Sequence, residues 1–263
     1  MELAQRSGFS IPNSKIMKIS NHELFVVDRY DRQDIRIYDC TSYLHYTDEH
    51  PSQPYNVVSG FDNYCRSHIP NAAFLDLQQD LSENNSPYSF TIPALHDLAE
   101  RFKKQGVGEP FHIILYSANG MQWATRIWWM LYAAGYQRVS ILNGGFAAWQ
   151  EAGLPTQESI TKWEPAEFEA RPKPNIFVGK QRVLNAIDDE KTVLLNALTS
   201  DLHLGESARY GRPGRIPTSL NIPFTSFMKN GLDAGSVINI NMLRWSIHLL
   251  VGALAGNQYM ARY

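Results

Sequence analysis

Residues 113–153 read IILYSANGMQWATRIWWMLYAAGYQRVSILNGGFAAWQEAG, and this stretch decides the fold. It opens with the short apolar run Ile113–Tyr116, which is typical of a strand buried on both faces. From Ala124 to Ala134, apolar side chains recur at helical spacing, and Gly135 stands where a helix C-cap is expected. We therefore predict a buried strand followed by a helix.

The second half of the same stretch repeats this alternation. It comprises a short β-rich run, a turn and a helix, at Val139–Leu142, Asn143–Gly145 and Phe146–Ala152. Gly153 and Pro155 follow and close the helix. Strands that alternate with helices imply a parallel sheet with helices on both faces. The predicted fold class is therefore α/β.

A weak internal repeat extends this pattern over the rest of the chain. The matching segments of a first copy and a second, shorter copy are 35–39 with 193–197, 67–72 with 214–219, and 134–137 with 255–258. Between the copies, the sequence is charged, interrupted by prolines and aperiodic, which is typical of a linker. We expect a first domain at 22–155, a linker at 156–175 and a shortened second domain at 176–263.

Composition excludes several classes of protein. Hydrophobic residues make up 44% of the 263 residues, which rules out a disordered chain. A net charge of −2 leaves no field that would hold nucleic acid or an anionic membrane. Two cysteines are too few for a disulfide scaffold or a thiolate-rich zinc site, and no apolar run approaches the ~18 residues that span a bilayer. We expect a cytoplasmic protein with no metal, cofactor, nucleic-acid or membrane partner. Whether it has a protein partner stays open.

The loop that follows the first buried strand is the first candidate site. Its residues are Ser117, Ala118, Asn119, Gly120, Met121 and Gln122. A loop that runs from a parallel strand into a helix directs backbone N–H groups at any anion bound there. However, no histidine or aspartate lies beside Ser117 in the sequence to activate its hydroxyl as a nucleophile. We favour a polar loop that caps the helix over a catalytic loop.

Three motifs occur in order within residues 22–155. They are SHIPNA at 67–72 followed by DL at 76–77, RIWWML at 126–131, and VSILNGGF at 139–146 followed by Trp149 and by GLP at 153–155. Together they resemble the tandem rhodanese family, the thiosulfate and 3-mercaptopyruvate sulfurtransferases. The resemblance implies two rhodanese-like domains, each a central parallel sheet flanked by helices. It further implies that the first domain is structural and that the second, here incomplete, carries the chemistry.

The resemblance also implies a cysteine at the start of a strand-to-helix loop in the second domain. A thiolate there attacks the outer sulfur of a donor, and converging backbone N–H groups hold the resulting persulfide. Placing the strand at Ser236–Ile238 puts the position of this cysteine near Asn239. Residues 239–246 contain neither a thiol nor the glycines that such a loop needs. We therefore assign no catalytic residue and expect impaired or absent transfer of sulfur to cyanide or a thiol.

Four arginines are candidates for binding a small sulfur-containing anion such as thiosulfate. Arg209, Arg212 and Arg215 recur at three-residue spacing in a loop marked by Gly and Pro, and Arg244 follows within 239–246. Guanidinium groups suit oxyanions because they present a fork of donors. The alternative is a solvated loop whose arginines pair with neighbouring side chains.

The two cysteines receive different interpretations. Cys40 follows a buried strand, where a cysteine is usually a small core residue. Cys65 precedes Arg66 and His68, and nearby cations lower the pKa of a thiol. No anion-binding loop follows Cys65, so we expect it to have no functional reactivity.

Three functional hypotheses remain open. The chain is a sulfurtransferase-like protein that has lost turnover but keeps an anion pocket, or a working sulfurtransferase whose loop is altered in the chain given. The third hypothesis is an interaction module that binds a protein partner along the interface between its domains. An extended surface groove with exposed aromatic side chains would favour this third hypothesis.

Overall fold

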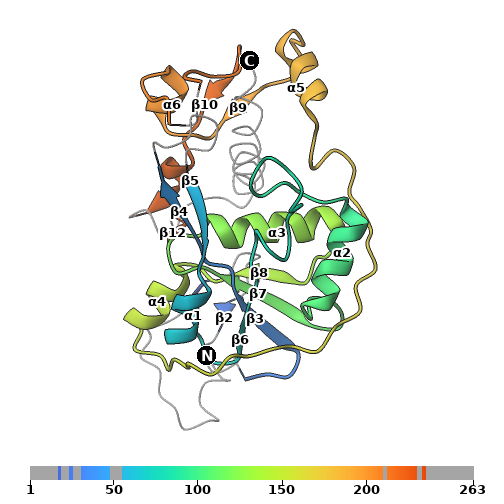
Figure 1. Ribbon diagram of the computed structural model, residues 1–263, viewed down its shortest axis with the longest axis vertical. Coiled ribbons are helices and arrows are strands. Elements are labelled where there is room, and N and C mark those ends of the chain that lie inside the picture. Colours follow the sequence, from blue (N-terminus) through green and yellow to red (C-terminus); the bar gives the residue numbers. More distant parts are fainter. Residues whose placement is uncertain are drawn as a thin grey trace.

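The central feature of the molecule is a parallel sheet of four strands. The computed structural model describes residues 17–18, 24–25, 31–47, 55–209, 212–229 and 233–234. The strands of this sheet are β3 (Ile35–Asp39), β6 (Ala72–Phe74), β7 (His112–Tyr116) and β8 (Val139–Ile141). They pair in the order β6-β3-β7-β8 with every pair parallel, as the alternation of strands and helices predicts. Figure 1 shows helices on both faces of this sheet.

Alternate side chains of β7 pack into two separate hydrophobic cores. Ile113 and Leu115 face a core that contains residues of α2 (Leu95–Lys104) and α3 (Gln122–Ala134). Ile114 and Tyr116 face a second core that includes Trp149 of α4 (Gly145–Glu151). Because both faces are covered, the strand is apolar at every position rather than at every second one. The continuous run Ile113–Tyr116 in the sequence is thereby explained.

Helix α3 begins two residues before the predicted start at Ala124. The Thr125 N–H donates to the carbonyl of Met121, which makes Met121 the N-cap. At its other end the helix stops at the predicted Gly135, whose φ of 99° is left-handed and suits glycine. The helical spacing of apolar residues predicted the apolar face of α3 from Ala124 onward. The first two residues of the helix, Gln122 and Trp123, were not part of that spacing.

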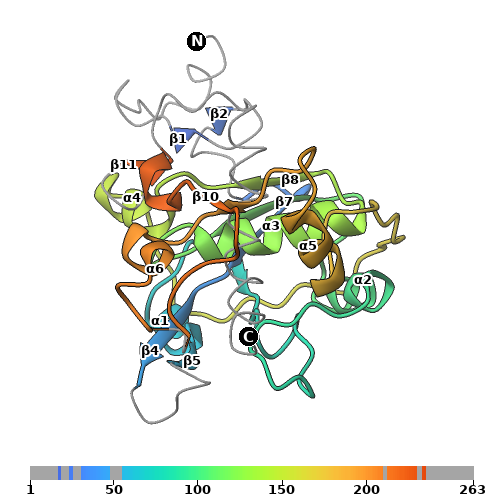
Figure 2. The same cartoon turned by 90° about the horizontal axis from the view of Figure 1, so that it is seen from above.

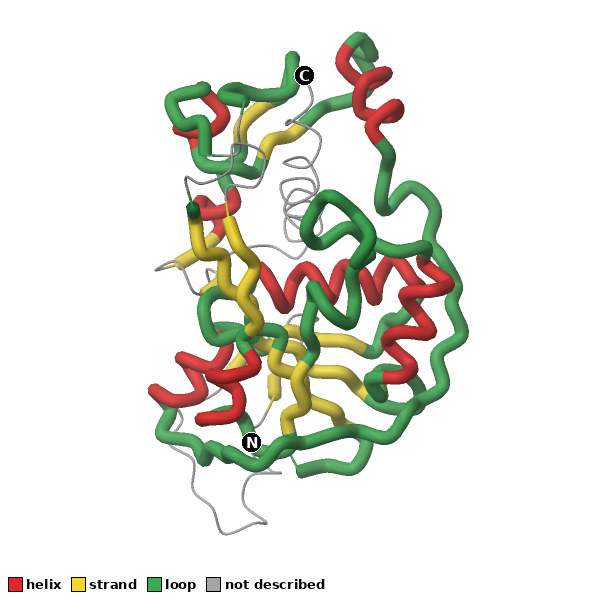
Figure 3. The backbone as a smooth tube through the Cα atoms, viewed as in Figure 1, coloured by secondary structure: helices red, strands yellow, loops and turns green. Residues whose placement is uncertain are grey.

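Residues 156–175, predicted as a linker, form an extended strap along the first domain. Figure 3 shows this strap as a long loop segment between α4 and α5 (Lys180–Ile187). Backbone bridges join Gln157 to His68, Thr161 to Ala73, and Glu167 to Glu109. The strap therefore packs on the first domain instead of crossing freely from one domain to the next.

One buried arginine holds the middle of the strap. The Arg36 guanidinium donates to the carbonyl of Gly106 and, at 2.8 Å, to the carbonyl of Glu164. It also lies 3.6 Å from the centre of the Phe111 ring and 5.2 Å from that of Trp163. The aromatic faces and carbonyl oxygens stabilise the Arg36 guanidinium without a carboxylate, while its buried Nε has no hydrogen-bond partner among the described residues.

The end of the strap caps helix α3. The N–H groups of Arg171 and Lys173 each donate at 2.8 Å to the carbonyls of Ala134 and Ala133, which have no partner inside the helix. Farther along, Phe177 packs against Trp129, whose side chain is buried. Strap and helix are thus joined by backbone hydrogen bonds and by apolar contact.

The remaining described elements are short. Before the strap, a hairpin of β4 (Ser42–Tyr46) and β5 (Tyr55–Ser59) and helix α1 (Phe61–Arg66) complete the first domain, and β1 (Met17–Lys18) pairs with β2 (Leu24–Phe25). After α5 come β9 (Leu195–Asn196), α6 (Ser200–Leu204), β10 (Leu220–Asn221), the 3-10 turn Phe224–Phe227, β11 (Met228–Lys229) and β12 (Asp233–Ala234). Strands β9 and β10 are parallel, and Figure 2 shows α5 and α6 well separated. The strand expected at 236–238 lies outside the described residues.

We predict that Gly135→Ala destabilises the protein by about 2 kcal/mol, because alanine disfavours the left-handed backbone and crowds a neighbour. A Cβ at this position would lie 2.4 Å from the Arg171 carbonyl oxygen of the strap. Urea unfolding measures the change. Gly179→Ala is the matched control, since Gly179 has a φ of −82° and a methyl group there would have no heavy atom within 4 Å. Equal stability losses in both variants would contradict the prediction.

Candidate functional site

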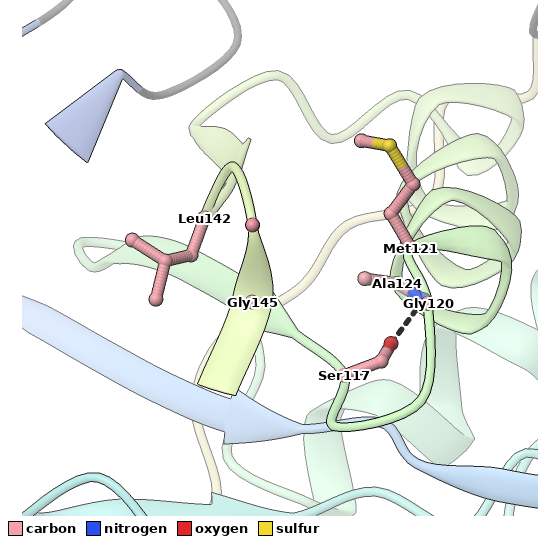
Figure 4. Close-up of a pocket in the computed structure, with 7 residues that line it drawn as sticks. Ser117, Gly120, Met121, Ala124, Leu142 and Gly145 are labelled. Carbon is pink, nitrogen blue, oxygen red and sulfur yellow. Dashed lines mark hydrogen bonds between the residues drawn. The ribbon is translucent and has the colours of Figure 1, made fainter. Parts of the chain in front are cut away.

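The loop Ser117–Gln122 lies at the carboxyl end of the sheet, where ligands of parallel sheets gather. It connects β7 to α3, and Figure 4 shows the loop turning beside the segment that carries Leu142 and Gly145. The six predicted loop residues are therefore brought together at one place. Their contacts decide what the loop can do.

Hydrogen bonds from within the domain hold this loop in place. The Ser117 Oγ accepts from the N–H of Ala124 at 3.0 Å, a bond marked in Figure 4. The Ala118 N–H donates to Thr41 Oγ1 at 2.9 Å, and Asn119 Nδ2 donates to the carbonyl of Ser42 at 2.7 Å. The Ser117 hydroxyl thus serves the first turn of α3, as a helix cap does.

The hollow beside this loop is small and uncharged. It has a volume of about 210 Å³ with open solvent included, and it is too tight to enclose a water molecule. Its lining consists of Ser117, Gly120, Met121, Ala124, Leu142, Gly144 and Gly145. A Cβ on Gly145 would lie 2.2 Å from the Ser117 carbonyl oxygen, so the two loop segments are in direct contact. This arrangement offers neither a charged group nor a nucleophile that is free to react.

A buried carboxylate lies next to this loop, and sequence reasoning did not single it out. Asp39 ends β3 with 3% of its surface exposed. Its Oδ1 accepts from the N–H of Thr41 at 2.9 Å and from the Thr41 hydroxyl, which itself accepts from Ala118. Burial raises the pKa of Asp39 to about 6, although hydrogen bonds from Thr41 and Tyr116 oppose the shift. Asp39 is thereby linked to the loop through one hydroxyl group.

The arginines of the second candidate site contact different neighbours. Arg209 lies with its Cζ 5.0 Å from the centre of the Tyr46 ring, on strand β4. Arg215 donates through Nη1 to the His203 carbonyl of α6 at 3.4 Å, and Arg212 is exposed. Burial and the charge of Arg215 lower the pKa of His203. Asn239 and Arg244 lie outside the described residues.

Both cysteines lie in the first domain and are free thiols. Cys40 is fully buried, and burial raises the pKa of its thiol well above the ordinary value. Cys65 is half-buried on α1, and its helix has six residues. Neither thiol lies in the loop Ser117–Gln122, so the described structure supplies no thiol at the head of a strand-to-helix loop.

The described residues form neither a metal-binding cluster nor a membrane-spanning helix. No group of three or more His, Cys, Asp or Glu side chains in the described part of the chain is arranged to hold a metal ion. None of the helices in that part is long and apolar enough to cross a membrane.

Comparison with known proteins shows what the chain is similar to. The model of the rhodanese-like domain family matches residues 26–152. Over 172 residues the chain is 36% identical to 3-mercaptopyruvate sulfurtransferase from Mus musculus, a match that covers 63% of this chain and 58% of the mouse protein. It is 29% identical over 171 residues to thiosulfate sulfurtransferase from Bos taurus, covering 63% of this chain and 57% of that protein. The matches thus span less than two thirds of these relatives.

Solved structures extend the likeness of fold beyond the first domain. SseA from Escherichia coli, a 3-mercaptopyruvate sulfotransferase, aligns with a TM-score of 0.64 and 24% identity over 89% of this chain and 91% of that chain. Tum1 from Saccharomyces cerevisiae aligns with a TM-score of 0.64 and 17% identity over 86% of this chain and 84% of its own. The chain therefore has the α/β architecture of two rhodanese-like domains.

We predict that the free energy of unfolding of the wild-type protein, taken relative to that of Asp39→Asn, falls by about 2 kcal/mol as pH rises from 4 to 7. A pKa raised to about 6 means that the folded state binds the Asp39 proton more tightly than the unfolded chain does. The stabilising contribution of the protonated acid is therefore present below pH 4 and lost as pH rises through 6. Urea unfolding of both proteins across this range measures it. A stability difference that does not change with pH would contradict the prediction.

Proposed function

We propose that this chain is a rhodanese-family sulfurtransferase-like protein that binds a small sulfur-containing anion but has impaired or no sulfur transfer. The observation that carries the proposal is the placement of its thiols. Both cysteines belong to the first domain, and Cys40 is sealed in the core. A persulfide carrier needs a thiolate held by converging N–H groups, and no residue from 66 to 263 is a cysteine.

The positions of the cysteines suggest a different role for each part of the chain. In the proposal, residues 22–155 are structural, 156–175 connect, and 176–263 form the degenerate domain that would otherwise carry the chemistry. The packed loop Ser117–Gln122 supports a structural first domain, because the Ser117 hydroxyl, the Ala118 N–H and the Asn119 Nδ2 are used in hydrogen bonds within the domain. The relatives named 3-mercaptopyruvate and thiosulfate sulfurtransferase support the substrate class. Two free cysteines fit a reducing, cytoplasmic compartment.

The second candidate function is an anion-binding or protein-binding module without turnover. The arginine loop, residues 209–215, favours it, because Arg212 is exposed and Arg209 reaches across to Tyr46 of the first domain. Such a loop provides forked donors at the boundary between the two halves of the chain. Binding and turnover are therefore measured separately.

We predict no sulfurtransferase activity with thiosulfate or 3-mercaptopyruvate as donor and cyanide or a thiol as acceptor. Thiocyanate formation is followed colorimetrically, and intact mass spectrometry after exposure to donor reports any added sulfur atom. The wild-type protein, Cys65→Ser and Cys40→Ser are compared with a control without protein. Turnover in the wild-type protein that disappears only in Cys65→Ser would overturn the proposal and assign the nucleophile to Cys65.

We predict that thiosulfate binds weakly, with a Kd on the order of 1 mM. The guanidinium groups of the arginine loop would donate to it, but no converging backbone N–H groups would add to their hydrogen bonds. Arg212→Ala should weaken binding, and added salt should weaken it further because exposed charges are screened beyond about 8 Å. Isothermal calorimetry on both proteins measures the effect. Arg182→Ala is the control, since Arg182 is an exposed arginine on α5. Identical binding by the wild-type protein and Arg212→Ala would show that the arginine loop is merely solvated.

A further inference from the structure

Helix α3 carries a buried arginine that no carboxylate neutralises within the described part of the chain. Arg126 has 4% of its surface exposed, and the described ion pairs do not include it. Its Nη2 donates to the Phe90 carbonyl at 3.0 Å, and its Cζ lies 5.3 Å from the centre of the Phe177 ring. Burial lowers the pKa of Arg126 to about 10, which still leaves the group charged at neutral pH.

Three donors near Phe90 have no acceptor within the described residues. The Nε and Nη1 of Arg126 are buried without a hydrogen-bond partner, and so is the indole Nε1 of Trp123. Trp123 precedes Arg126 by three residues, so both side chains leave α3 on neighbouring positions of one face. Each also meets Phe90: the Trp123 and Phe90 rings are 5.4 Å apart, and Arg126 binds the Phe90 carbonyl. The unused donors therefore gather around one residue.

The backbone at Phe90 is held in an unfavourable conformation. Its φ of 59° is left-handed, which is rare for a bulky side chain and costs on the order of 1 kcal/mol or more. Its N–H donates to Gln78 Oε1 at 2.8 Å, and its carbonyl oxygen accepts a hydrogen bond from Arg126 Nη2. The loop between β6 and α2, which crosses α3 in Figure 1, is thus fixed against the helix at this point. A fixed loop cannot turn a further carbonyl toward the unused donors.

A buried charge with unused donors is expensive unless something supplies acceptors. Removing a guanidinium from water is costly even after the protein relaxes, and each buried donor without a partner adds its own desolvation cost. A water molecule would accept one or two hydrogen bonds but would not neutralise the charge. An anion does both. Because Arg126 and Trp123 are only 4% and 2% exposed, an anion between them would be closed off from solvent and would have to be small.

We propose that Trp123 and Arg126 form an enclosed site for one small inorganic anion of halide size. The site is distinct from the arginine loop and does not depend on the proposed function. The anion would accept from Arg126 and from the Trp123 indole, while Phe90 holds the guanidinium from its other side. Its occupation would neutralise the one positive charge that α3 carries into the interior of the described domain.

Thermal unfolding in sodium bromide, at constant ionic strength, tests the site. A ligand that binds only the folded state raises the midpoint by an amount that grows with its concentration. Bromide should raise the midpoint of the wild-type protein and leave that of Arg126→Met unchanged. Arg138→Met is the matched control, because Arg138 is an exposed arginine paired with Glu109 and should keep the wild-type response.

A second variant guards against misfolding of Arg126→Met. Trp123→Phe keeps an aromatic ring at this position but removes the indole N–H together with the second ring, so bromide should bind at least about tenfold more weakly, the ratio that one hydrogen bond to a charged group contributes. Crystals of the full chain grown with bromide should show an anomalous peak beside the Arg126 guanidinium. Water or a carboxylate of the chain at that place would overturn the proposal. So would a bromide response equal in the wild-type protein, Trp123→Phe and Arg126→Met.

Discussion

The hydrogen bonds between the strap and the last turn of α3 are the contacts on which the connection between the two halves of the molecule depends. Arg171 and Lys173 donate to carbonyls that a helix end leaves without partners. They can approach only because Gly135 has no side chain and takes a left-handed backbone. The path of the chain out of the first domain is thus set by one glycine and two backbone amides.

The fixed path of the strap also positions its aromatic side chains against the first domain. Trp163 is placed against Arg36, and Phe168 enters the core beside Phe102 at a ring distance of 6.1 Å. These contacts cover the edge of the domain that α2 and the sheet would otherwise expose to water. A segment that reads as polar and irregular therefore contributes apolar cover at the positions where it contains an aromatic residue.

The sequence allowed the sheet and helix α3 to be predicted because the strands are short apolar runs and the apolar residues of α3 recur at helical spacing. The path of the strap could not be predicted in that way. Its proline-punctuated residues have no period, and its partners lie far away in the chain, as Arg36 does from Glu164. The start of α3 was placed two residues late for a related reason, since its first turn is fixed by hydrogen bonds, such as that from Ala124 to Ser117, as well as by burial.

The same distinction between local sequence and long-range packing applies to the residues of the candidate site. The loop Ser117–Gln122 could be located because a strand and a helix bracket it, and the arginine loop because its residues are adjacent in sequence. The pKa values of Asp39 and Arg126 depend on how deeply each group is buried. The burial of a charged side chain produces no recognisable pattern in the amino-acid sequence. Arg126 is part of the motif RIWWML, which contributed to the family resemblance without indicating that two of the Arg126 guanidinium nitrogens lack acceptors among the described residues.

The capped end of α3 restricts where the molecule can bend. As far as Phe177 the chain is tied to the first domain by backbone hydrogen bonds, a buried arginine and aromatic packing. Immediately beyond it, Val178 and Gly179 are exposed, and Gly179 has no heavy atom within 4 Å of its missing side chain. Phe177 is therefore the last residue before α5 that is held against the first domain in this way. A pull on the chain beyond it would reach the last turn of α3 through the two hydrogen bonds that Arg171 and Lys173 donate.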